Sequence, residues 1–447
     1  MREPDGVCVT MLFREIATPN GFDMIVPAGG VAKPILTVSG WMATMASLMK
    51  HGPLLRLLLA RGFAEFAYTM SGVALGWQVY EKTHSALALG LMGLVQFVPS
   101  VVFVFVAGHV ADRLERKRIA AACQFASAIL SLFLAFGCLG GWLNVSEIFA
   151  AILLLGVAGA FEDPALAALT PAVAPAGMVA RSSALFYGAS TFASIAGPAV
   201  GGLLYAWSPA VPYAVMAGFW AVSAACILTM AIGAFVPPGD PPALGQLFAG
   251  LSFVRNEPAI FGTISLDLFA VLLGGATTVL PIFARDVLHT GVLGLGVLRA
   301  APSVGALVMT IILARRSMTR LVGIRMFGAV IVFGLATVGF ALSHFLWLSI
   351  VMLIVMGASD TVSVVIRRAL VQLRTPDAMR GRVGAVNALF INASNQLGGF
   401  ESGITAALWG VVPATLFGGF GTIVVALLWM YIFPTLRNVQ RLESEVV

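Results

Sequence analysis

One basic run separates two long apolar stretches of the chain, and it reads Gly108-His-Val-Ala-Asp112-Arg113-Leu-Glu115-Arg116-Lys117-Arg118. The apolar stretches cover residues 86–110 and 117–140. Each is long enough to cross the hydrocarbon core of a bilayer, which takes about 20 apolar residues in a helix. Because a polar loop must join two successive crossings, this part of the chain is predicted to be a helical hairpin in a membrane.

The whole chain has the composition of a membrane protein. Of its 447 residues, 59% are hydrophobic and only 10% are charged, and the mean hydropathy is +0.97. Soluble domains carry roughly a quarter charged residues. The chain from Leu54 to Pro434 has room for roughly twelve crossings, so we expect an all-α protein with twelve transmembrane helices. The predicted crossings cover residues 54–80, 86–110, 117–140, 146–170, 181–206, 210–235, 259–285, 292–314, 323–343, 345–369, 380–410 and 412–434.

The basic residues gather in alternate loops. The net charge of +6 could indicate a nucleic-acid partner, but the placement of the charges favours a topological signal, because cytoplasmic loops carry excess Lys and Arg. We therefore expect both termini in the cytoplasm, a multi-pass protein of the cytoplasmic (inner) membrane, and no nucleic-acid partner. The basic residues of these loops are Arg113, Arg116, Lys117, Arg118, Arg181, Arg255, Arg315, Arg316, Arg320, Arg325, Arg367, Arg368, Arg374, Arg380 and Arg382.

Internal repetition divides the chain into two related halves. The run Gly93-Leu-Val-Gln96-Phe-Val-Pro99-Ser-Val matches Gly296-Val-Leu-Arg299-Ala-Ala-Pro302-Ser-Val, 203 residues later. Pro175-x-x-Met178-x-x-Arg181-x-x-Ala184 matches Pro376-x-x-Met379-x-x-Arg382-x-x-Ala385 at an offset of 201. Gly197 and Gly202 then correspond to Gly398 and Gly403. Because each half contains an even number of crossings, the halves are parallel repeats, an arrangement that places a substrate site between them near the midplane.

The expected organisation has five parts. These are a disordered cytoplasmic extension (1–52), a six-helix bundle (53–235), a cytoplasmic linker rich in Pro (236–258), a second six-helix bundle (259–434) and a cytoplasmic tail (435–447). The extension lacks the apolar core of a signal peptide. A mis-called start codon is an alternative interpretation, since Met42, Met45 or Met49 would begin the chain just before the first crossing.

The run from Gly108 to Arg118 resembles the signature Gly-x-Leu-Ala-Asp-Arg-x-Gly-Arg-Lys of the major facilitator superfamily, with Val110 and Glu115 as departures. The resemblance implies a secondary transporter whose twelve helices form two pseudo-symmetric bundles of six. It also implies a cytoplasmic latch, in which the acid meets the positive end of a helix. A plain positive-inside anchor is the alternative. The latch residues would be Gly108, Asp112, Arg113, Arg116 and Lys117. The matching loop of the second half, Ala314 to Arg320, keeps the bases and lacks the acid.

The fifth predicted crossing contains Ala193-Ser-Ile-Ala-Gly197-Pro198-Ala-Val-Gly201-Gly202. This run is similar to the Gly-x-x-x-Gly-Pro-x-x-Gly-Gly motif of the family's drug exporters, with Ala193 in place of the first Gly. Small residues let helices approach closely, and proline bends a helix. Simple packing is the alternative to an exporter-specific role. The segments 57–63, 79–83 and 380–387 also resemble the enterobactin-exporter and macrolide-efflux branch.

Ionisable groups inside predicted crossings are candidates for the substrate and proton-coupling site, because such groups are costly in a membrane. Five acids fall on the first, fourth, seventh and tenth crossings, which in the family line the central cavity. Arg299 could instead neutralise Asp267 in a silent ion pair, and Asp163, before Pro164, could merely mark a broken helix. The full candidate set is Glu65, Gln96, Glu162, Asp163, Asp267, Arg299, Asp360, Asn395 and Glu401, with Asn392 and Gln396 beside the last two.

The expected function is proton-coupled export of an amphipathic small molecule such as a drug, a macrolide or a siderophore. A carboxyl group in a poorly hydrated cavity can bind and release a proton near neutral pH. The sequence has no phosphate-binding loop, metalloprotease motif or nucleophile elbow, so no enzyme is expected, and no cofactor or metal. The partners expected are a small-molecule substrate, protons and membrane lipid, with the chain as a monomer. An importer or lipid flippase of the same fold, or a receptor or scaffold that transports nothing, are the alternatives.

Overall fold

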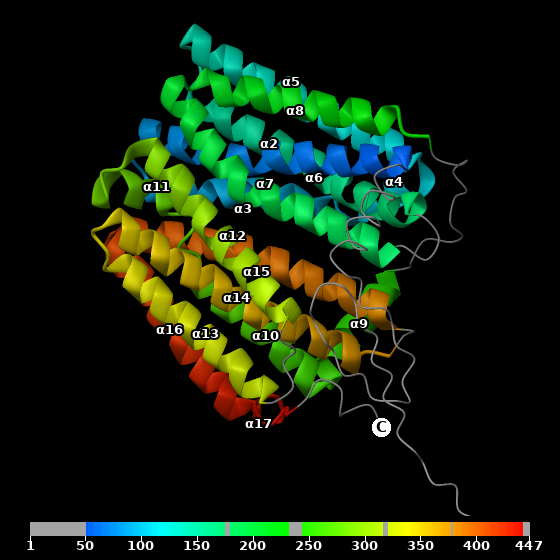
Figure 1. Ribbon diagram of the computed structural model, residues 1–447, viewed down its shortest axis with the longest axis vertical. Coiled ribbons are helices and arrows are strands. Elements are labelled where there is room, and N and C mark those ends of the chain that lie inside the picture. Colours follow the sequence, from blue (N-terminus) through cyan, green and yellow to red (C-terminus); the bar gives the residue numbers. More distant parts are fainter. Residues whose placement is uncertain (1–50, 175–178, 232–243, 316–320, 377–378, 441–447) are drawn as a thin grey trace, which may run out of the picture. The chain divides into compact units, whose positions relative to one another are not determined.

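The computed structural model describes residues 51–174, 179–231, 244–315, 321–376 and 379–440. Within these ranges the chain forms helices and short connections, with no β-strand. The helices are shown in Figure 1. They are α2 (Gly52–Thr83), α3 (Ala86–Val102), α4 (Val104–Arg113), α5 (Arg116–Gly140), α6 (Val145–Val173), α7 (Val179–Trp207), α8 (Ala210–Leu228), α9 (Leu244–Asn256), α10 (Pro258–Leu273), α11 (Leu280–Ile282), the π-helix η1 (Phe283–Val287), α12 (Gly291–Arg315), α13 (Val322–Ala341), α14 (Leu346–Arg374), α15 (Arg380–Trp409), α16 (Val411–Ile432) and α17 (Pro434–Arg437).

Helices occupy every predicted crossing, which confirms the all-α membrane fold. In the described part of the chain, eight helices are long and apolar enough to cross a membrane, or nine if α10 is counted with the end of α9, to which it is bent by 102°. The remaining crossings correspond to α2, α15 and α3. The helices α2 and α15 carry charged side chains, while α3 is an apolar helix of 17 residues that α4 continues.

Two crossings are broken where continuous helices were expected. The second is interrupted at Phe103, between α3 and α4. The seventh, predicted over 259–285, stops at Leu273 and resumes as α11 and η1 after a turn. A glycine pair, Gly274 and Gly275, lies in this turn, and a Cβ atom at Gly275 would lie 2.5 Å from the backbone oxygen of Gly398 on α15. The turn therefore allows two backbones to approach more closely than side chains would permit.

Some predicted boundaries differ from the structure. The sixth crossing, expected to reach residue 235, ends as α8 at Leu228. The segment expected to be a linker contains the helix α9, which contacts the start of α15: a Cβ atom at Gly250 would lie 3.0 Å from the backbone oxygen of Arg382. Residues 1–50 and 441–447, in the predicted extension and tail, lie outside the described residues, as do Pro175 and Met178 of the second repeat.

The helix ends define two faces of the bundle. At the face where α2 begins, which we name the terminal face, Arg56 donates to the backbone oxygen of Thr229 after α8. Lys117 at the start of α5 donates to the backbone oxygen of Met230 at 2.9 Å. At the opposite face, where α2 ends, the hydroxyl of Tyr80 donates to Asp286 of η1. That bond joins the two halves of the chain.

Glycines bring the two halves into close contact along two helix pairs. A Cβ atom at Gly202 of α7 would lie 2.8 Å from the backbone oxygen of Val292 and 3.2 Å from Cα of Gly296, both on α12. A Cβ atom at Gly403 of α15 would lie 2.6 Å from Cα of Gly90 on α3. All these residues lie toward the opposite face, because α3 and α12 begin there. The halves are therefore packed backbone to backbone at that face.

Candidate functional site

A cavity of about 290 Å³ lies among helices of both halves. Its walls come from α2, α3, α5, α6 and α8 of the first half and from α15 of the second. Along α2 the lining residues Arg61, Glu65 and Tyr68 recur at helical spacing, which puts them on one stripe of that helix. The polar and aromatic residues that line the cavity include Arg61, Glu65, Tyr68, Gln96, Glu162, Asp163, Trp220, Asn392 and Gln396.

The cavity lies between the middle of the bundle and the terminal face. On α2 its lining runs from Arg61 to Ser71, within the first two thirds of a helix that begins at that face. On α6 it runs from Leu155 to Leu166, in the later part of a helix that returns to that face. The glycine contacts between the halves lie beyond the other end of the cavity, toward the opposite face.

Three predicted acids line this cavity together. Glu162 is 6% exposed, and its Oε1 accepts a hydrogen bond of 2.9 Å from Nε2 of Gln124 on α5. Glu65 is half-buried, and Asp163 has an exposed side chain that faces the cavity. The helix α6 continues through Pro164, so the alternative that Asp163 marks a broken helix is wrong. The predicted Gln96 of α3 lines the same cavity.

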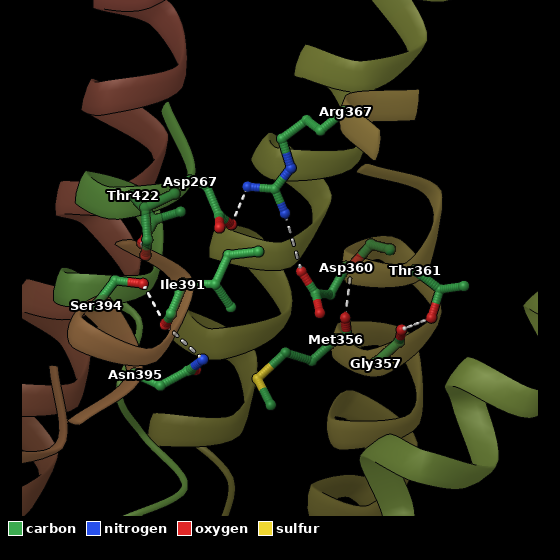
Figure 2. A network of polar contacts seen from close by, with 12 residues as sticks. Asp267, Met356, Gly357, Asp360, Thr361, Arg367, Ile391, Ser394, Asn395 and Thr422 are labelled. Carbon is green, nitrogen blue, oxygen red and sulfur yellow. Dashed lines mark hydrogen bonds and ion pairs between the residues drawn. The ribbon is translucent and has the colours of Figure 1, made fainter. Parts of the chain in front are cut away.

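The two acids of the second half form a separate cluster with Arg367, which Figure 2 shows. Arg367 of α14 forms a close ion pair with Asp267 of α10. Its Nη2 also lies 3.7 Å from Oδ1 of Asp360, two helix turns earlier on α14. The side chain of Arg367 is 8% exposed and that of Asp267 is 13% exposed. The interpretation of Arg367 as a loop anchor is therefore wrong, because its guanidinium neutralises acids inside the bundle.

Arg299 does not pair with Asp267, so that predicted ion pair is wrong. Arg299 projects from α12 toward α2 of the other half, where a Cβ atom at Gly72 would collide with Nη1 and one at Gly76 would lie 3.6 Å from Nη2. Its Nε is buried and has no hydrogen-bond partner among the described residues. The lack of side chains at Gly72 and Gly76 makes room for the guanidinium.

The predicted residues of α15 do not meet at one site. Asn395 donates to the backbone oxygen of Ile391 within its own helix at 2.9 Å, and Glu401 lies 3.5 Å from the hydroxyl of Ser402. Neither residue lines the cavity, whereas Asn392 and Gln396 do. The four-residue spacing of Asn392 and Gln396 puts both on one face of α15.

The predicted latch is described in part. Arg113 is exposed at the end of α4, and Lys117 at the start of α5 joins the end of α8 through Met230. Glu115 pairs instead with Arg118 at 2.6 Å. Gly108 lies in α4 and Arg116 begins α5. The side chain of Asp112 lies outside the part of the structure that is described.

The small residues of α7 pack against both halves. A Cβ atom at Gly197 would collide with the hydroxyl oxygen of Thr69 on α2, and one at Gly201 would lie 3.3 Å from Cα of Met70. Gly202 faces α12 instead. A Cβ atom at Gly296 of α12 would lie 2.7 Å from the backbone oxygen of Pro198. The run from Gly197 to Gly202 therefore holds α7 between α2 and α12.

Sequence reasoning missed three cavity residues. Arg61 lies next to the acids, Tyr68 lies on the same stripe of α2, and Trp220 of α8 contributes an indole Nε1 that is buried without a hydrogen-bond partner in the described chain. The positions of Arg61 and Tyr68 could have been found from their spacing to Glu65. Trp220 gave no such signal, because aromatic residues are common in apolar helices.

Two related helical bundles around a polar cavity, in a chain with several membrane-spanning helices, define a secondary transporter. The chain belongs to the Major Facilitator Superfamily, whose family model matches residues 57–400. It is therefore a transporter of small molecules rather than an enzyme, and a multi-pass protein of the inner membrane.

The chain is similar over most of its length to proteins with a named activity. It is 27% identical over 415 residues to the enterobactin exporter EntS of Citrobacter koseri, and the aligned region covers 89% of this chain and 96% of that protein. It is 25% identical over 421 residues to the enterobactin exporter EntS of Escherichia coli, and the aligned region covers 91% of this chain and 98% of that protein.

Solved transporter structures share the fold. The structure of the nucleoside transporter NupG superposes on this chain with a TM-score of 0.65 at 18% identity. The matched region covers 85% of this chain and 99% of the NupG chain. A bacterial homologue of the human lysosomal transporter Spinster, in an inward-facing and unoccupied conformation, has a TM-score of 0.66 at 13% identity, with coverage of 86% and 95%. At these identities the likeness concerns the fold alone.

Proposed function

We propose that the chain is a proton-coupled exporter of amphipathic small molecules of the drug, macrolide or siderophore type. The observation that carries this proposal is that three acids, Glu65, Glu162 and Asp163, line one cavity inside the membrane-spanning bundle. Ionisable groups at such depth are costly and mark ion and substrate pathways. The similarity to proteins named enterobactin exporters supports the export direction and a siderophore-like substrate.

The two halves, residues 53–235 and 259–434, would rock about the cavity, with 236–258 as their linker. We place both termini in the cytoplasm, in agreement with the basic loops at the terminal face. With that orientation the cavity lies toward the cytoplasm, while the opposite face is held by the glycine contacts and by the Tyr80–Asp286 bond. This is the conformation in which an exporter takes up its substrate. The monomer is the proposed transport unit.

The acids would couple transport to protons by competition. A protonated carboxyl group is neutral, and its loss of a proton restores a negative charge that a substrate or Arg61 can meet. Glu162 is the most buried of the three and is positioned by Gln124, so it has the least access to water. The cluster of Asp267, Arg367 and Asp360 would serve the second half, where two carboxylates share one guanidinium.

The remaining candidates have secondary roles in this proposal. Gln96, together with Asn392 and Gln396, would supply hydrogen bonds to the substrate from the cavity wall. Asn395 and Glu401 lie on α15 away from the cavity, and they would reach it only if α15 turned during the cycle. Lys117 would act in the latch with Asp112, because its contact with Met230 joins two helix ends at the terminal face.

The test is substrate flux in proteoliposomes with an imposed pH gradient, with radiolabelled enterobactin or a macrolide as substrate. Wild type is compared with Glu65→Gln, Glu162→Gln and Asp163→Asn. The matched control is Glu147→Gln, at the other end of α6, where the carboxylate accepts from the backbone of Asn144 at 2.8 Å. Glutamine can replace glutamate in this capping box, so the control removes one charge and keeps the helix.

We expect at least one cavity variant to lose about tenfold or more of the gradient-driven flux, a general acid–base scale of effect, while gradient-free exchange of substrate persists. The control should transport like wild type. If all three cavity variants respond to the gradient as Glu147→Gln does, proton coupling through these acids is refuted. The sign of the flux relative to the gradient distinguishes an exporter from an importer.

A further inference from the structure

Arg299 carries a positive charge in the middle of the bundle. Within the described residues it forms no ion pair, and its Nε is buried without a hydrogen-bond partner. Arg367 provides the contrast, because it lies between the carboxylates of Asp267 and Asp360. A charged group held inside a membrane protein without an ionic partner is costly, which marks it as a functional candidate.

The position of the guanidinium is built into α2. Glycine at positions 72 and 76, one turn apart, leaves a groove that the guanidinium fills, since a Cβ atom at Gly72 would collide with Nη1. Both glycines belong to the first half, and Arg299 belongs to the second. The guanidinium therefore lies at the boundary between the halves, on the side of the cavity that faces the glycine contacts of α7 and α12.

This position adjoins the part of α2 that lines the cavity. Gly72 follows Ser71 and lies one turn after Tyr68, and both of those residues line the cavity. A guanidinium next to this cavity whose Nε lacks an acceptor within the described residues indicates a ligand that carries acceptor oxygens, because buried polar groups are normally paired.

The acids of the cavity lie away from Arg299. Seven residues of α2 separate Glu65 from Gly72, which is about 10 Å along a helix. Glu65, Glu162 and Asp163 are accompanied by Arg61, which also lines the cavity. The acids thus lie in the part of the cavity nearer the terminal face, whereas Arg299 lies against α2 next to the other end, where no acid of the cavity neutralises it.

We propose that Arg299 binds an acidic oxygen group of the transported substrate, a planar pair of oxygens such as a carboxylate, hydroxamate or catecholate. The planar fork of an arginine side chain matches such a pair with two parallel hydrogen bonds. The inference rests on the proposed transport function and specifies its substrate class. Because Arg299 and its glycine groove belong to different halves, the bound oxygen group contacts the joint that must open during the cycle.

The experiment measures binding to purified full-length protein in detergent with two probes, a dansyl-labelled aromatic carboxylate and its methyl ester. Their ratio of dissociation constants reports the charge preference and is insensitive to apolar contacts. The variants are Arg299→Gln, Arg299→Lys and Gly72→Ala, which displaces the guanidinium and keeps its charge. Glu147→Gln, at the start of α6 and away from the cavity, serves as the control for the loss of one charge. Retained binding of the ester shows that a variant is folded.

We expect wild type to prefer the carboxylate by about tenfold or more, the scale of one charge-assisted hydrogen-bonded pair. Arg299→Gln should reduce the ratio to about one, Gly72→Ala and Arg299→Lys should reduce it in part, and Glu147→Gln should not reduce it. A wild-type protein that binds both probes equally or binds neither overturns the inference, as does an unchanged ratio in the Arg299 variants. If Arg299→Gln fails to fold, Gly72→Ala and Arg299→Lys decide. Proton-driven flux is measured separately. A wild-type preference for the carboxylate that depends on Arg299, in a protein without gradient-driven transport, refutes only the proposed function.

Discussion

The substitution Gly202→Ala should weaken the closed state of the opposite face. Its Cβ atom would lie 2.8 Å from the backbone oxygen of Val292 and 3.2 Å from Cα of Gly296, whereas ordinary contacts are 3.4–4 Å. The atoms in the way belong to the backbone of α12, so no side chain can rotate aside. The two helices must separate by about 0.6 Å or more, and overpacking of this kind costs about 1–3 kcal/mol.

That cost applies only while the halves are closed at this face, because α7 and α12 belong to different halves. A shift of about 1–3 kcal/mol changes the ratio of two conformations roughly 5- to 150-fold. The assay is labelling of Ser100→Cys, a cavity residue with an exposed side chain, by a membrane-impermeant maleimide in a protein whose four native cysteines are replaced. Vesicles of known orientation separate labelling from the two faces.

Labelling from the opposite face should rise in Gly202→Ala by a factor within that range. The control is Gly188→Ala on the same helix, where no described atom lies within 4 Å of the added Cβ. Equal labelling rates in Gly202→Ala, Gly188→Ala and the parent protein would refute the reasoning that the contact of α7 with α12 closes this face. A rise in both variants would point to a general loosening of α7.

Two further predictions concern polar contacts. Asp267→Asn should destabilise the protein by about 3–5 kcal/mol, because Arg367 keeps only the contact of 3.7 Å with Asp360; thermal unfolding in detergent measures this, and a smaller loss than in Asp360→Asn would contradict it. Tyr80→Phe should raise labelling of Ser100→Cys from the opposite face about tenfold, since a hydrogen bond to a charged group contributes about 1.5–3 kcal/mol. Tyr205→Phe is its control, because Tyr205 donates to Glu81 within one half, and similar labelling in the two variants would exclude a role for the bond between halves.

Much of the fold could be predicted because the bilayer imposes a simple rule on composition. Apolar runs of sufficient length located every crossing, and the basic loops indicated a topology. The break at Phe103 follows Pro99 of α3, whereas the break at Gly274 could not be predicted, because it depends on which backbone approaches the helix from outside. In the second case that neighbour is Gly398 of α15, far away in the sequence.

The candidate site could be predicted in part. Acids inside crossings are rare, so Glu65, Glu162 and Asp163 stood out and proved to line one cavity. Their partners depend on the rotation of each helix, which the sequence does not fix. For this reason the sequence allows Arg299 as an alternative partner of Asp267, where the structure has Arg367, and it does not separate Asn395 from Asn392, which differs from it by most of one helix turn.

The repeat accounts for the packing between halves but not for the chemistry of the cavity. In the repeat, Gly202 and Gly296 correspond to Gly403 and Gly93, yet Gly403 meets Gly90 instead, one turn closer to the start of α3. The two helix pairs thus share a type of contact in registers that differ by about 4.5 Å. Gly93 instead approaches Gln396, whose side-chain oxygen would lie 3.1 Å from an added Cβ atom.

This shift of register separates two residues that the repeat makes equivalent. Gln96 faces the cavity together with Gln396, whereas Arg299 enters the groove at Gly72. The acids that line the cavity consequently come from the first half, while Arg299 of the second half, which forms no ion pair within the described residues, lies against α2 next to the cavity. A substrate that bridges them must contact both halves at once, and its departure removes that contact. Because the two repeats differ, the charged groups are distributed unequally along α2, which identical halves could not provide.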